Sequence, residues 1–80
     1  MANIYKLQAK YNEIQQDMAT VQNQISRLEN EYAVLTDQYM NGNIPWDIGK
    51  DQRRIEREIN KLKIRYEKLS EKNRKIQFKL

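Results

Sequence analysis

Hydrophobic residues recur along the chain in alternating steps of three and four, in two arrays that are separated by one break. This spacing is the heptad repeat of a coiled coil, in which positions a and d of each heptad abcdefg form the seam between two helices. The pattern therefore predicts two long helices. The first array consists of Ile4, Leu7, Tyr11, Ile14, Met18, Val21, Ile25, Leu28, Tyr32, Leu35 and Tyr39. The second consists of Ile48, Gln52, Ile55, Ile59, Leu62, Tyr66, Leu69, Asn73, Ile76 and Leu80.

The break between the arrays has the composition of a turn. Residues 41–45 contain Gly42, which can take the left-handed conformation that closes a helix, and the only proline, Pro45, which suits the first turn of a helix. We expect a single domain over residues 1–80, with a helix over 3–40 capped by Asn3, a turn over 41–45 and a second helix over 46–79.

Folding the chain at this turn brings the two arrays into register. The facing pairs then include Tyr39 with Ile48, Leu28 with Ile59, Val21 with Tyr66 and Leu7 with Leu80. The predicted fold class is all-α, an antiparallel two-helix coiled-coil hairpin. Gln52 and Asn73 interrupt the second array, and a polar seam residue of this kind selects helix alignment or oligomeric state at some cost in stability.

A second face of the first helix is suited to contact with another protein. Its e column is nearly uncharged, and its b column carries small residues that allow another helix to approach closely. Two hairpins joined through this face would form a homodimer with the architecture of a four-helix bundle. The b column consists of Tyr5, Asn12, Ala19, Ser26, Ala33 and Met40, and the e column of Gln8, Gln15, Gln22, Glu29 and Thr36.

The predicted turn offers a second candidate contact. Ile44, Pro45 and the only tryptophan, Trp46, follow one another, and Met40 lies shortly before them. Tryptophan is the residue most enriched at the energetic centre of protein interfaces, so Trp46 with Ile44 and Met40 is a candidate anchor for a partner. The alternative is that Trp46 folds back over Tyr39 and covers the end of the hairpin.

Charge is distributed unevenly between the two halves of this basic chain. The net charge is +4; residues 1–46 carry three basic and five acidic side chains, whereas residues 47–80 carry twelve basic and six acidic ones. Seven of the basic residues occupy heptad positions c and g of the second helix, about 40° apart around the helix axis, and we call them the basic ribbon. They are Arg54, Lys61, Arg65, Lys68, Lys72, Lys75 and Lys79. Such a ribbon could contact nucleic-acid phosphates or an acidic partner, or be simply solvated.

Composition narrows the classes of function. The chain contains no cysteine and no histidine, so it lacks the thiolate and imidazole groups that most often bind metals or act as nucleophile and base. We therefore expect neither an enzyme nor a cofactor or metal site, and no small-molecule substrate. The mean hydropathy of −1.02 argues against a membrane segment. The lack of cysteine is compatible with a reducing, cytoplasmic setting, which we expect for this protein. Richness in Lys, Ile, Asn and Gln is typical of an AT-rich bacterial or phage genome.

These features favour a small protein-binding module, such as an adaptor, inhibitor or assembly factor, which acts through its helical contacts and associates with itself. The alternative interpretation is a basic helical hairpin that binds the backbone of RNA or DNA. A coiled-coil arm of a larger enzyme is a third interpretation, which the start of the sequence at Met1 makes less favoured.

Overall fold

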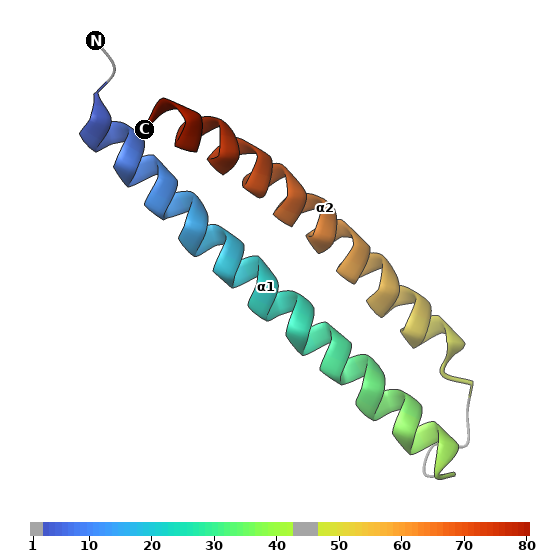
Figure 1. The fold of residues 1–80 in the computed structure, drawn as a ribbon. Helices are drawn as coiled ribbons and strands as arrows, with labels where there is room; N and C mark the ends of the chain where they lie inside the picture. Colours follow the sequence, from blue (N-terminus) through green and yellow to red (C-terminus); the bar gives the residue numbers. More distant parts are fainter. Residues whose placement is uncertain (1–2, 43–46) are drawn as a thin grey trace.

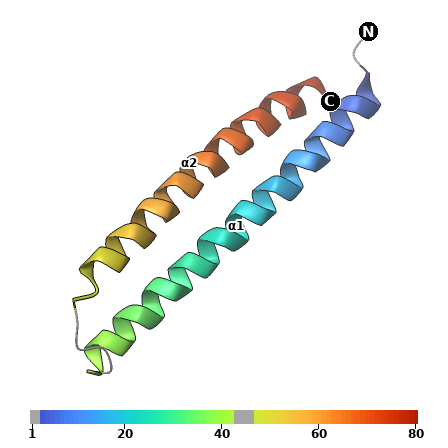
Figure 2. The same cartoon turned by 180° about the vertical axis from the view of Figure 1, so that it is seen from behind.

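The structure, a computed structural model, describes residues 3–42 and 47–80. These residues form two long helices, α1 (Ile4–Met40) and α2 (Gly49–Lys79), which run antiparallel (Figure 1). In the view from behind, the helices again lie side by side, with the two termini at the end opposite the turn (Figure 2). The molecule is a rod of 64 × 14 × 12 Å. The predicted all-α helical hairpin is confirmed.

Burial follows the predicted seam closely. Among the described residues, the seam positions are buried or half-buried except at the ends of the arrays, where Ile4, Tyr39 and Leu80 remain about half exposed or more. Outside the seam, Thr36 and Gly49 are the only half-buried residues of 3–42 and 47–80. The apolar core of the rod consists of Ile14, Val21, Ile25, Ile48 and Ile55.

Local chemistry determines where α1 begins and ends. The side chain of Asn3 accepts a hydrogen bond from the backbone N–H of Lys6 at 3.1 Å, so Asn3 is the N-cap that the sequence predicts. At the other end, Gly42 has a φ of 73° and its N–H donates to the Tyr39 carbonyl at 3.1 Å. A left-handed glycine that bonds back to the last turn is a common end of a helix, as expected here.

The second helix begins later than the sequence predicts. The sequence predicts a start at residue 46, whereas α2 starts at Gly49. The Asp47 carboxylate accepts the backbone N–H of Gly49 at 2.8 Å. This N–H therefore has an acceptor without an additional helical turn before Gly49. A Cβ atom on Gly49 would lie 3.1 Å from this carboxylate oxygen, so a larger residue would crowd the cap. The predicted contacts of Ile44, Pro45 and Trp46 lie outside the described residues.

Side chains that cross between the helices confirm the register. Tyr32 donates from its hydroxyl to Glu56 at 3.2 Å, one residue beyond its predicted partner Ile55. Gln52 donates to the Thr36 hydroxyl at 3.1 Å, next to its predicted partner Leu35. Near the open end, Asn73 donates to the backbone carbonyl of Tyr11 at 3.2 Å, one turn before Ile14. Every observed crossing thus lies within one turn of the predicted pairing.

Candidate functional site

The hairpin has two sides, which differ in chemistry. On the e side the e columns of both helices flank the seam, and a hollow beside the Tyr66 ring is lined by Gln22, Glu29, Lys63 and Glu67. On the g side a comparable hollow is lined by Gln24, Arg27, Leu28, Glu31, Glu58 and Leu62. Both hollows are open to solvent. The rod therefore presents surfaces rather than an enclosed site along its described length.

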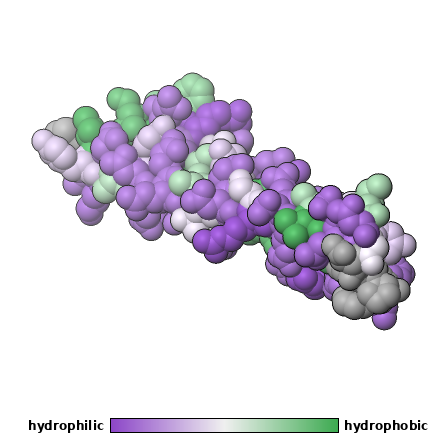
Figure 3. Space-filling model, turned by 90° about the horizontal axis from the view of Figure 1, so that it is seen from below, coloured by the Kyte–Doolittle hydropathy of each residue, from purple (hydrophilic) through white to green (hydrophobic). Residues whose placement is uncertain are grey.

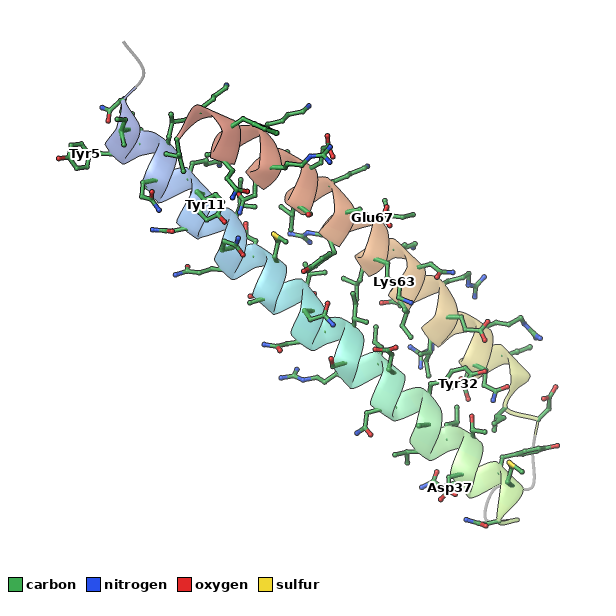
Figure 4. The ribbon with its side chains drawn as sticks, viewed as in Figure 1. Tyr5, Tyr11, Tyr32, Asp37, Lys63 and Glu67 are labelled. Carbon is green, nitrogen blue, oxygen red and sulfur yellow. The ribbon has the colours of Figure 1, made fainter. Side chains whose placement is uncertain are left out.

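The candidate contact face of α1 lies on the e side, and we call its b and e columns the α1 outer face. All six b-column residues are exposed, and the e column is exposed except for half-buried Thr36. Tyr5 is 88% exposed and Met40 78%, at opposite ends of the helix, while Ala19 and Ala33 lie between them. Tyr5 points away from α2, whereas Tyr32 lies between the helices (Figure 4). The α1 outer face carries one charge, Glu29.

The corresponding columns of α2 are more strongly charged. Its b column holds Arg53, Asn60, Glu67 and Arg74, and its e column holds Glu56, Lys63, Ser70 and Gln77. Desolvating charged side chains costs free energy unless each finds a partner. A helix that packs on the e side of the hairpin is therefore accommodated better over α1 than over α2.

At the turn end, the structure describes one of the three residues proposed as an anchor for a partner. Met40 is the last residue of α1 and is 78% exposed, next to Tyr39, which is 50% exposed. Ile44 and Trp46 lie outside the described residues. The described part of this end therefore presents an exposed apolar group, consistent with a contact surface.

Two of the seam tyrosines, Tyr11 and Tyr32, place their hydroxyls at the rim of the e side. Tyr11 accepts a hydrogen bond from the Gln15 amide at 3.0 Å, and Tyr32 donates to Glu56 at 3.2 Å. The hydrogen bond to the Glu56 carboxylate raises the pKa of Tyr32 above its ordinary value of 10.0, and partial burial of the phenol and the negative charge of Glu56 act in the same direction.

This contact leads to a pH-dependent prediction. Because the pKa of Tyr32 is raised in the folded hairpin, the Tyr32–Glu56 contact contributes stability fully below pH 10.0, and this contribution is lost as the pH rises through the folded-state pKa. We expect Glu56→Gln to lower the pKa of Tyr32, as followed by NMR titration of its ring, whereas Glu58→Gln on the g side leaves it unchanged. A Tyr32 pKa at or below 10.0 in the wild-type protein would contradict the contact.

The seven cations of the basic ribbon are all exposed, but the structure divides them into two groups. Arg54 lies 3.5 Å from Glu31 of α1, an ion pair that connects the two helices on the g side. In the chain as described, the other six cations of the ribbon form no ion pair. Among the described residues, the ribbon cations without an ion-pair partner are therefore the six from Lys61 onward.

Sequence reasoning missed two contacts that affect the candidate surfaces. Thr36 accepts from Gln52 at 3.1 Å while donating to the Tyr32 carbonyl at 2.9 Å, which removes this end of the e column from the free surface. The Arg54–Glu31 pair was also missed, although position c of one helix lies next to position g, which flanks the partner helix. Considering c–g pairs in the predicted register would have found it.

The surface is consistent with separate contact regions rather than one hydrophobic patch. On the face seen in Figure 3, hydrophilic residues dominate and hydrophobic ones occur in small separate groups. Across residues 3–42 and 47–80, neither helix has a stretch long and apolar enough to cross a bilayer.

Comparison with known protein families, with curated proteins and with solved structures finds no match to this chain. Functional assignment therefore depends on the surfaces of the hairpin itself.

Proposed function

We propose that this hairpin is a non-catalytic protein-binding module, acting as an adaptor, inhibitor or assembly factor, and that the α1 outer face is its main contact surface. The observation that carries the proposal is the contrast between the two helices on the e side. Apart from half-buried Thr36, the b and e columns of α1 are exposed, and they carry small residues in the middle and one charge, while the b and e columns of α2 carry several charges. A surface that costs little to desolvate is the one a partner helix can cover.

The incomplete burial of the seam supports the same proposal. Tyr11, Tyr32 and Tyr66 are only half-buried, and their rings lie at the e-side rim or beside its hollow. A helix packed over the α1 outer face would cover part of these aromatic rings as well as Tyr5 or Met40. Because burial of apolar area contributes about 25 cal/mol per Å², this additional contact would stabilise both the complex and the hairpin. The first partner we propose is a second copy of the chain, in an antiparallel four-helix bundle.

The test introduces a charge within the proposed contact, at one of its two alanines. We expect Ala33→Glu to weaken self-association at least about tenfold in sedimentation equilibrium, because the new carboxylate would be buried without a partner. Thr20→Glu is the matched control, since it adds the same charge at an exposed c position of the same helix. Glutamate is a good helix former, so both variants should keep the helical circular dichroism of the wild type.

A pull-down from the native host, with the same two variants, extends the test to other proteins. Partners retained by the wild type and Thr20→Glu but lost by Ala33→Glu would support the α1 outer face, and Trp46→Ala tests the turn separately. A concentration-independent monomer of 9.7 kDa would exclude the four-helix bundle. Partner capture that Ala33→Glu leaves unchanged would overturn the assignment of the contact to this face.

A further inference from the structure

The C-terminal half of α2 carries an uninterrupted strip of cations. Every residue at heptad positions c and g between residues 61 and 79 is lysine or arginine, and every one of them is exposed. We call this group the basic strip. At 1.5 Å per residue it extends about 27 Å along one side of the helix. It consists of Lys61, Arg65, Lys68, Lys72, Lys75 and Lys79.

Of the carboxylates near the strip, Glu67 and Glu71 lie on another side of the hairpin or are engaged elsewhere, while Asp17 and Glu58 share the g side with the strip but form no ion pair with it among the described residues. Glu71 is paired with Arg74, with an N–O distance of 2.7 Å. Glu67 lines the e-side hollow together with Lys63. The three ion pairs of the described residues involve Lys10, Arg54 and Arg74, all outside the strip. The positive charge of the strip is therefore available to an external anion.

We propose that the basic strip binds the phosphate backbone of a double-stranded nucleic acid. A row of six cations along about 27 Å matches most of one turn of a duplex, which is about 34 Å long. Lysine and arginine that contact phosphates position a protein on a duplex without reading its sequence. This surface is independent of the α1 outer face, because it lies toward the g side of α2.

The chemistry of the strip favours a duplex over other polyanions. Proteins that hold single strands combine positive charge with aromatic side chains on which bases stack, and the c and g columns from residue 61 to 79 contain no aromatic residue. Tyr66 is in the seam, and Phe78 is at position f, beside Arg74 and Gln77 and outside these two columns. A protein interface would also have apolar anchors at its centre, and these two columns offer none.

The experiment measures how binding depends on salt. Fluorescence anisotropy of labelled 20-base-pair DNA and RNA duplexes would be followed from about 50 to 200 mM salt, the range over which phosphate contacts weaken steeply. If all six cations contact phosphates, the logarithm of the binding constant should fall against the logarithm of salt concentration with a slope of about −5. The two duplexes distinguish DNA from RNA as the source of the same backbone chemistry.

Two triple variants with the same net charge locate the site. Lys68→Gln, Lys72→Gln and Lys75→Gln together should weaken binding and reduce the steepness of the slope by about 3, since each phosphate contact contributes about 1. The control combines Lys50→Gln, Arg53→Gln and Lys63→Gln, which are exposed f, b and e positions of the same helix and form no ion pair among the described residues. We expect this control to retain the wild-type slope. All six substitutions are at exposed positions, and glutamine has nearly the helix propensity of lysine.

Three results would overturn the proposal. One is the absence of binding to either duplex at about 50 mM salt, where phosphate contacts are strong. Another is an equal loss of binding in both triple variants, which would show general charge attraction rather than a site. The third is tighter, strip-dependent binding of polyglutamate than of either duplex, which would assign the strip to an acidic protein. The Ala33→Glu variant should bind the duplex as the wild type does, so failure of the proposed protein contact would be seen separately.

Discussion

Ile55→Ala is expected to destabilise the hairpin by about 2–5 kcal/mol, a loss typical of an isoleucine truncated in a packed core. Ile55 is 0% exposed and is the most deeply buried of the described side chains. The hydrogen bonds from Tyr32 to Glu56 and from Gln52 to Thr36 connect the helices at this level, so the walls of the new cavity cannot easily collapse. A domain of this size has a total stability of about 4–12 kcal/mol, so the substitution removes a large part of it.

Thermal unfolding followed by circular dichroism would measure the effect, and the melting temperature should fall on the order of 10–25 °C. Ile64→Ala is the matched control, because Ile64 lies on the same helix but is 53% exposed. We expect the control to change the free energy of unfolding by less than about 0.5 kcal/mol. Similar losses for the two variants would mean that the f position of α2 is buried in solution, and that the seam is not the main source of stability.

The seam was predictable because its signal is redundant. Ile14, Val21 and Ile25 repeat at the coiled-coil period over many turns, so an error at one position could not shift the pattern. The end of α1 was predictable for a different reason: Gly42 can take a positive φ without steric cost, and the structure uses it in that way.

The start of α2 could not be predicted because the sequence allows two positions for Asp47, inside the first turn of the helix or just before it. Pro45 and Asp47 suit the first turn of a helix, but aspartate serves equally well as a side-chain acceptor just before one. The structure adopts the second arrangement, in which Asp47 holds the N–H of Gly49. Because both placements suit these residue types, the sequence pattern alone does not distinguish them.

The candidate surfaces were predicted as columns of residues, but not their state of pairing. Periodicity places Arg54 and Lys61 in the same column, yet the structure pairs Arg54 with Glu31 and leaves Lys61 free of an ion pair among the described residues. That difference depends on the axial offset of the two helices and on the reach of long side chains. The basic strip is therefore the basic ribbon without Arg54, the one ribbon residue in an ion pair among the described residues.

Asn73→Leu is expected to stabilise the hairpin by about 1–3 kcal/mol, which is the cost of leaving a buried polar atom without a partner. Asn73 is 4% exposed, and its Oδ1 atom is buried and accepts no hydrogen bond from the described residues. Its Nδ2 donates to the Tyr11 carbonyl at 3.2 Å. That carbonyl lies inside α1, where it also accepts a backbone bond of the helix, so it would not be left unpaired by the substitution.

The increase in melting temperature should be on the order of 5–15 °C, with Gln52→Leu as the comparison. Gln52 is only half-buried and donates to Thr36, so its acceptor oxygen can reach water and its replacement should gain less. Since a polar seam residue costs stability in return for specificity, Asn73→Leu should also broaden the distribution of oligomers in sedimentation velocity. A loss of stability on Asn73→Leu that Asn73→Val, a residue closer to asparagine in size, also shows would contradict this interpretation, because overpacking would not then explain the loss.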